Sequence, residues 1–216
     1  MNTRLVGLLV VTVTGMIIAY FMIQDQRQLG IYNPVKIDEK LVDQSLQSKM
    51  SGHRIGSFQL TDQFGDVISE KNFENKIYVA DFFFTTCPGI CIAMAKQMYR
   101  VQDAFSEHDN FAILSHTVQP EIDTPEILDE YAKLYEAKPG IWFFATGDRQ
   151  IIFDLARKSY FAATLEPGHE ETEMVHTENF VLVDKEKRIR GIYDGTSTRD
   201  VDRLIEDIEI LFHDYE

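Results

Sequence analysis

Basic residues and cysteines are both scarce in this sequence, and each scarcity argues against a class of protein. The 216 residues include 21 Lys and Arg against 35 Asp and Glu, a formal net charge of −14. Such a charge repels a phosphate backbone, so we do not expect nucleic-acid binding. Two cysteines are too few for a disulfide scaffold. With 44% hydrophobic and 12% aromatic residues, the composition instead predicts an ordinary packed core.

Charge is also missing locally, in a long run near the N-terminus. Residues 5–23 read LVGLLVVTVTGMIIAYFMI, and as a helix they would cover about 30 Å, the thickness of a hydrocarbon core. A cleaved signal peptide is the alternative, but its apolar stretch is usually only about 7 to 15 residues, and no A-x-A-like site precedes Gln24. We therefore expect a short tail (1–4), a transmembrane signal anchor (5–23) and a polar linker (24–51) that tethers the remaining residues.

Residues 52–216 have the size of a single domain. Hydrophobic periodicity, turn residues and helix caps predict the following elements: strands at 58–60, 67–69, 77–84, 111–118, 141–146, 180–184 and 188–195, and helices from about 88 to at least 105, from a cap at Asp123 or Thr124 to about 137, at 148–160 and at 198–212. This order predicts an α/β fold in which helices flank a mixed sheet. Ligands of such sheets bind at the carboxyl ends of the strands.

Both cysteines lie just beyond the predicted central strand, in TTCPGIC. We expect Cys87 to enter the helix, with Pro88 in its first turn and Cys91 one turn later. Residues four apart share a helix face, so the two sulfurs can converge on one ion or form a disulfide. Two buried, inert cysteines are the alternative, but an intervening Pro-Gly indicates an exposed turn and favours a functional pair. Two thiolates suit Cu(I) or Zn²⁺, and an added imidazole gives a site that copper can use in both oxidation states.

Six histidines could supply that imidazole. Three lie in polar contexts where we expect solvated side chains, namely His53, His108 and His213. His169 lies in an acidic loop, and His116 lies in the strand at 111–118, where a structural role is expected. His176 precedes the strand that begins near Asn179 and could face the first β–α turn, so its role as a ligand stays open on these grounds. Met94 and Met98 could act as thioether ligands, but their helical spacing favours packing in the core.

Four segments carry a resemblance to a known family: FFFTTCPGIC, DTPEILDEYA from Asp123, WFFATGD from Trp142, and VHTENFVLVD. In this order and spacing, from about residue 55 to the C-terminus, the chain resembles the Sco/SenC family of membrane-anchored copper proteins. The resemblance implies a thioredoxin-like fold and binding of Cu(I) or Cu(II) by Cys87, Cys91 and His176. It also implies an inner-membrane location with the domain in the periplasm, and a role in assembling the copper site of cytochrome c oxidase subunit II.

The sequence departs from the family pattern at two positions. Ile92 stands where many members have proline, and Gln119 stands where many have aspartate. Neither position is a copper ligand in the family, so the resemblance still implies copper loading, and the missing aspartate bears instead on partner docking or ligand orientation.

The function we expect is that of a monomeric metallochaperone that works by ligand exchange and is not an enzyme. The first alternative is a thiol-disulfide oxidoreductase that uses a redox-active Cys87–Cys91 disulfide to reduce the cysteines of the copper acceptor. Such reductases carry CxxC and a cis-proline, whereas this chain has CxxxC and Met174-Val175-His176 in the corresponding place. A thiol peroxidase is the second alternative, but it would leave the paired cysteine and His176 without a role.

Overall fold

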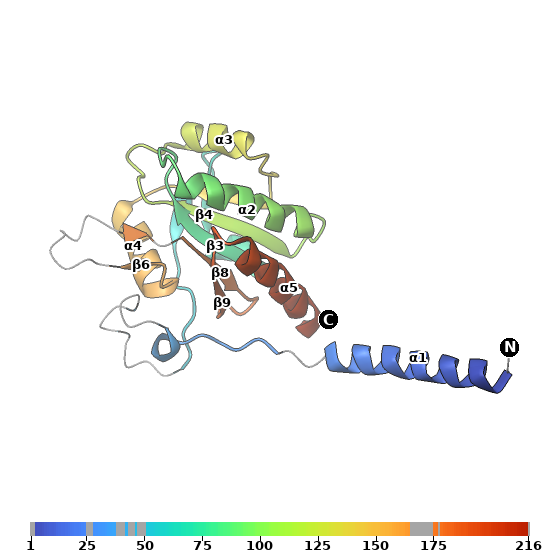
Figure 1. Ribbon diagram of the computed structural model, residues 1–216. Coiled ribbons are helices and arrows are strands. Elements are labelled where there is room, and N and C mark those ends of the chain that lie inside the picture. Colours follow the sequence, from blue (N-terminus) through green and yellow to red (C-terminus); the bar gives the residue numbers. More distant parts are fainter. Residues whose placement is uncertain are drawn as a thin grey trace.

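The computed structural model describes residues 3–24, 28–37, 42, 46, 51–164, 175–176 and 178–215. Its elements follow in this order (Figure 1): α1 (Thr3–Gln24), the 3-10 helix η1 (Pro34–Lys36), β1 (Gln59–Thr61), β2 (Val67–Ser69), the 3-10 helix η2 (Glu70–Phe73), β3 (Ile77–Phe83), α2 (Ile90–Phe105), β4 (Phe111–Thr117), α3 (Pro125–Leu134), β5 (Trp142–Ala145), α4 (Arg149–Asp154), the π-helix η3 (Leu155–Ser159), β6 (Ala163–Thr164), β7 (Val175–His176), β8 (Asn179–Val183), β9 (Ile189–Asp194) and α5 (Thr198–Asp214).

A five-stranded mixed sheet forms the centre of the domain, with the strand order β5-β4-β3-β8-β9. Strands β3, β4 and β5 run parallel, and β8 and β9 are antiparallel to their neighbours. Every residue of β3 and β4 is buried, which explains their unbroken apolar sequences. The predicted mixed α/β architecture is therefore confirmed, and the short β6–β7 pair is an addition that the sequence pattern did not indicate.

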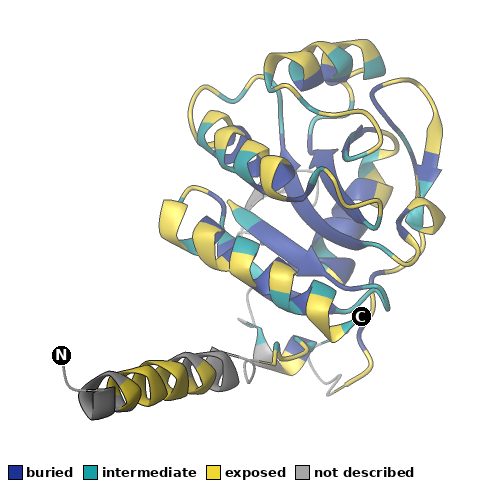
Figure 2. Cartoon of the chain, turned by 90° about the vertical axis from the view of Figure 1, so that its right-hand side faces the viewer, coloured by how far each residue is buried: buried dark blue, intermediate teal, exposed yellow. Residues whose placement is uncertain are grey.

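Each face of the sheet has its own hydrophobic core. Helices α2, α3 and α5 cover one face, and the N-terminal segment with α4 and η3 covers the other. Figure 2 shows the buried strands between helices whose outer sides are exposed. Met94 and Met98 of α2 are 1% and 0% exposed, which agrees with the predicted packing role. Parallel strands β3 and β4 both end beside the loop that leads into α2, so this edge of the sheet carries the cysteine segment.

Helix α1 occupies the run for which we predict the membrane anchor. Side chains such as Val11 and Met16 are 70% and 67% exposed. Among the residues that the structure describes, no helix meets the combined length and apolarity that a membrane crossing requires. The anchor therefore stays a prediction.

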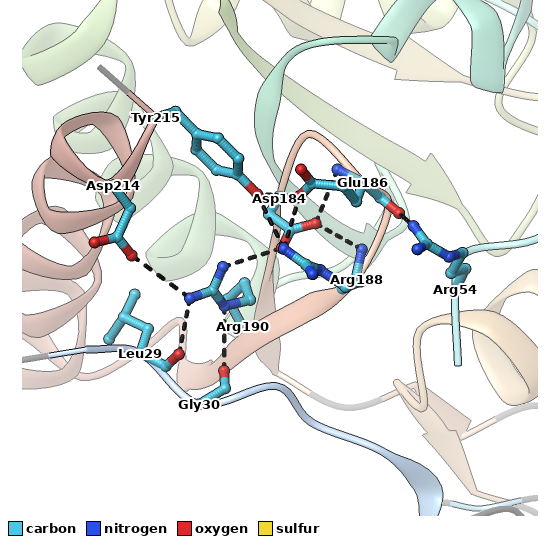
Figure 3. Close-up of polar contacts among 9 residues, drawn as sticks. All are labelled: Leu29, Gly30, Arg54, Asp184, Glu186, Arg188, Arg190, Asp214 and Tyr215. Carbon is cyan, nitrogen blue, oxygen red and sulfur yellow. Dashed lines mark hydrogen bonds and ion pairs between the residues drawn. The ribbon is translucent and has the colours of Figure 1, made fainter. Parts of the chain in front are cut away.

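Part of the predicted linker is bound to the domain, which corrects the expectation of a plain tether. The backbone N–H of Tyr32 donates to the carbonyl of Ile189 at 2.8 Å and extends the β9 edge. The Arg190 guanidinium donates to the carbonyls of Leu29 and Gly30 at 2.8 and 3.2 Å (Figure 3). The linker makes these contacts through its backbone N–H and C=O groups. Because every sequence has such groups, the composition of the linker could not predict them.

Acidic side chains hold Arg190 in place beside the linker (Figure 3). Its Nη1 is 3.1 Å from Asp184 Oδ2, and its Nη2 is 3.7 Å from Asp214 Oδ2. The side chains of Arg190 and Asp184 are 8% and 0% exposed. Arg188 also pairs with Asp184, at 2.8 Å. A buried carboxylate with two guanidinium partners is well compensated, and removal of one partner leaves part of its charge unpaired.

We expect Arg190→Met to lower the free energy of unfolding by about 3 kcal/mol and to expose the linker at residues 28–32 to protease. Urea unfolding and limited proteolysis measure the two effects. Arg100→Met is the matched control, because Arg100 is 40% exposed and pairs with Asp202 across the surface between α2 and α5. Equal protease resistance in both variants would contradict the role of Arg190 in holding the linker.

Candidate metal centre

The two cysteines flank the start of α2. Cys87 lies in the turn after β3, half-buried, and its backbone N–H donates to the carbonyl of Phe84 at 3.3 Å. The helix begins at Ile90 with Gly89 as its N-cap, so the prediction that Pro88 lies in its first turn is wrong. Gly89 has no side chain to cap the helix, and the Cys87 sulfur takes that place: the backbone N–H of Cys91 donates to Cys87 Sγ at 3.4 Å.

Opposite shifts of pKa distinguish the two thiols. Partial burial acts to raise the pKa of Cys87, but hydrogen bonds from the N–H groups of Cys91, Gly89 and Ile90 and from the Cys91 thiol outweigh it, and the pKa is lowered. Cys91 is 1% exposed, and burial, together with the neighbouring Cys87, raises the pKa of its thiol to about 12. The pair therefore combines a partly exposed thiol whose pKa is lowered with a buried thiol whose pKa is raised.

A buried carboxyl group lies on the same face of the sheet as Cys91. Asp81 of β3 is 4% exposed and accepts a hydrogen bond from Ser115 Oγ at 2.5 Å, and Ser115 Oγ accepts from Trp142 Nε1 at 2.9 Å. Burial raises the pKa of Asp81 to about 7, although the Ser115 hydrogen bond opposes the shift. Asp81 was not singled out from the sequence. It could have been found as the one charged residue in the apolar run IYVADFFF.

Asp81 predicts a pH dependence of stability. Its folded-state pKa of about 7 exceeds the ordinary value of 3.8, so the folded chain keeps a proton that the unfolded chain releases, and stability falls as pH rises from about 4 to 7. Asp81→Asn removes this proton release and should raise the free energy of unfolding at pH 8 by on the order of 2–4 kcal/mol, with little effect at pH 4. Urea unfolding at the two pH values measures the change. A variant that is equally destabilised at both would contradict the assigned pKa.

The backbone of His176 lies in β7, where it pairs with Ala163 of β6. Its side chain lies outside the described residues, as does the whole of His169. The ligand role of His176 therefore stays a prediction. Among the side chains that the structure describes, no group of three or more His, Cys, Asp or Glu is placed to hold a metal ion.

Two other histidines are buried in the cores. His116 is 0% exposed and stacks on Phe82 at 4.6 Å between ring centroids, and burial lowers its pKa to about 4, which confirms the structural role. The prediction that His53 is solvated is wrong: it is 4% exposed, and its Nε2 lies 2.8 Å from the carbonyl oxygen of Ser159. His108 and His213 are exposed, as predicted.

The model of the SCO1/SenC family matches residues 47–213. The chain belongs to the SCO1/SenC family. A curated Sco relative, the SCO1 protein homolog of Bacillus subtilis, is 30% identical over 159 residues, which are 73% of this chain and 82% of the relative.

Solved Sco structures share the fold. BsSco, a member of the Sco family of cytochrome c oxidase assembly proteins in which a disulfide switch was identified, is 28% identical with a TM-score of 0.63, over 74% of this chain and 93% of that one. ScoI of Arabidopsis thaliana, solved with copper bound, is 25% identical with a TM-score of 0.59, over 74% of this chain and 98% of that one. These relatives support the thioredoxin-like form of the mixed sheet.

Proposed function

We propose that this chain carries copper, bound by Cys87, Cys91 and His176, to a copper acceptor. The observation that supports the proposal most directly is the contact between the two thiols at the start of α2. They are close enough for each to alter the pKa of the other. Copper bound to the Arabidopsis relative supports the choice of metal.

The donor set fits copper in both oxidation states. Thiolates are soft ligands that select Cu(I), and an added imidazole suits Cu(II). A bound metal deprotonates a coordinating thiol outright, so copper can displace the proton that burial holds on Cys91. Copper loading is therefore expected to release protons.

Exposure of the two sulfurs suggests how the metal leaves. Cys87 is half-buried and Cys91 is buried, so an incoming ligand of the acceptor meets the Cys87 side first. Transfer then proceeds by exchange of ligands at the metal, with no turnover of substrate. In this proposal the chain is a binding protein rather than an enzyme.

The proposed acceptor is subunit II of cytochrome c oxidase. Its support is that BsSco belongs to a family of cytochrome c oxidase assembly proteins. We place the domain in the periplasm as a monomer, anchored in the inner membrane by residues 5–23. A tethered domain has a high effective concentration near other membrane proteins, which favours a membrane-bound acceptor.

The unlike pKa values of the two thiols favour a second candidate function, reduction of an acceptor disulfide. In this reaction the Cys87 thiolate attacks the disulfide and releases one acceptor thiolate as a mixed disulfide forms. Cys91 then loses its proton and attacks the Cys87 sulfur, which releases the second acceptor thiolate. The acceptor gains two electrons, and the chain is left with a Cys87–Cys91 disulfide that blocks copper loading until it is reduced.

Replacement of the proposed ligands should separate their roles. We expect Cys87→Ser and Cys91→Ser each to weaken Cu(I) binding by more than about 100-fold, because each removes a ligand rather than an outer partner. His176→Ala should mainly weaken Cu(II) binding and shift its thiolate charge-transfer absorption. Competition with a chelator under anaerobic conditions and absorption spectroscopy measure these effects on the purified full chain.

His108→Ala is the control for the histidine variant, because His108 is exposed and its ring packs against Phe212 and Phe105, at 4.6 and 5.9 Å between ring centroids. Unchanged Cu(I) affinity in both cysteine variants would refute copper binding by the pair. Identical Cu(II) spectra for His176→Ala and the native chain would remove His176 from the ligand set.

A further inference from the structure

The loop that carries Cys87 lies between the end of β3 at Phe83 and the start of α2 at Ile90. Besides the contacts at the Cys87 sulfur, the Cys87 N–H donates to the carbonyl of Phe84 within this loop. Two threonines precede Cys87, and both bond to the segment that follows β4. Thr86 Oγ1 donates to Gln119 Oε1 at 3.1 Å, and Thr85 donates twice to Asp123.

The Asp123 carboxylate receives three hydrogen bonds from two elements. The backbone N–H of Thr85 donates to Oδ2 at 3.2 Å, and Thr85 Oγ1 donates to Oδ1 at 2.5 Å. Thr117 Oγ1, at the end of β4, donates to Oδ2. Asp123 is 0% exposed, and a carboxylate is buried at such a site only when hydrogen bonds replace its hydration.

The contacts of Asp123 also show which residue caps α3. Either Asp123 or Thr124 was predicted to cap α3, and Thr124 does so by accepting from the N–H of Ile127. Asp123 therefore does not cap the helix, and its buried side chain bonds to Thr85 of the cysteine loop instead. It is the residue that connects the start of α3 to the segment ahead of Cys87.

We propose that Asp123 is a positioning residue that holds Thr85, and through it the Cys87 sulfur, in the geometry that lets both thiols bind one ion. This inference rests on the proposed copper function and adds a residue outside the ligand set. Ligand geometry depends on such outer partners, whose loss typically lowers metal affinity roughly 10- to 100-fold. Asp suits the role because both of its side-chain oxygens accept from donor groups, whereas an amide would direct its NH₂ group at one of these donors.

The test compares two threonines that make the same contact at different places. Thr196 donates its backbone N–H at 2.8 Å and its hydroxyl at 2.6 Å to Asp194, in the turn between β9 and α5. Thr85→Val and Thr196→Val each remove one hydroxyl donor from a carboxylate, and only the first lies ahead of Cys87. Thr85→Ser keeps the hydroxyl, and Thr85→Ala removes it with less bulk if the valine does not fold.

Two readouts are made on the purified full chain. The first is Cu(I) affinity by chelator competition. The second needs no copper: it is the equilibrium in which the two thiols give two electrons and two protons to glutathione disulfide, forming the Cys87–Cys91 disulfide and two glutathione thiols. Urea unfolding of each variant reports whether it is folded.

Thr85→Val should weaken Cu(I) binding by roughly tenfold or more and shift the glutathione equilibrium toward the free thiols, because a looser loop lowers the effective concentration of one sulfur near the other. Thr85→Ser should restore both values, and Thr196→Val should leave both native. Equal values for the two valine variants in both readouts would overturn the role of Asp123. If the native chain itself took up no copper, the proposed function would fail, while the glutathione equilibrium would still decide the positioning role.

Discussion

The cysteine pair lies where the carboxyl end of β3 meets the first backbone N–H groups of α2. This junction determines how exposed each thiol is and in which direction its pKa shifts. At this junction the Cys87 sulfur accepts from the helix end, while Cys91 turns into the core beneath it. One thiol is thereby stabilised as an anion at a partly exposed position, and the other is kept protonated by burial. Sheet order, helix packing and the Asp123 contacts all serve to place this junction at one edge of the domain.

Two buried aspartates near the junction are each held by hydroxyl side chains. Asp81 lies within the central strand and is held by Ser115, and Asp123 lies beyond the strand ends and is held by threonines. Burial raises the pKa of the first to about 7, whereas the second accepts three hydrogen bonds from Thr85 and Thr117. Asp81 and Asp123 are thus two of the buried carboxyl groups of this acidic chain, one in the strand that leads to the cysteine segment and one bonded to Thr85 ahead of Cys87.

Periodicity predicted the strands and helices well because β3 and β4 are buried on both faces and the helices carry regular apolar stripes. It failed where long-range contacts override local chemistry. His53 has polar sequence neighbours but packs against Phe161, at 4.5 Å between ring centroids, and the linker binds Arg190 through backbone carbonyls. The cysteine pair was found from TTCPGIC, whereas the inward turn of Asp123 could not be, because aspartate and threonine are both good helix caps.

The central claim is that the cysteine pair handles copper for an oxidase, and the copper content of the assembled oxidase tests it most directly. The measurement uses a deletion strain grown with scarce copper and complemented with the native chain or with the double variant Cys87→Ser, Cys91→Ser. The account predicts that the native chain restores the copper content, that the double variant does not, and that added copper partly replaces the protein. Full restoration by the double variant would contradict the account, and rescue by a reductant but not by copper would assign the pair to disulfide reduction instead.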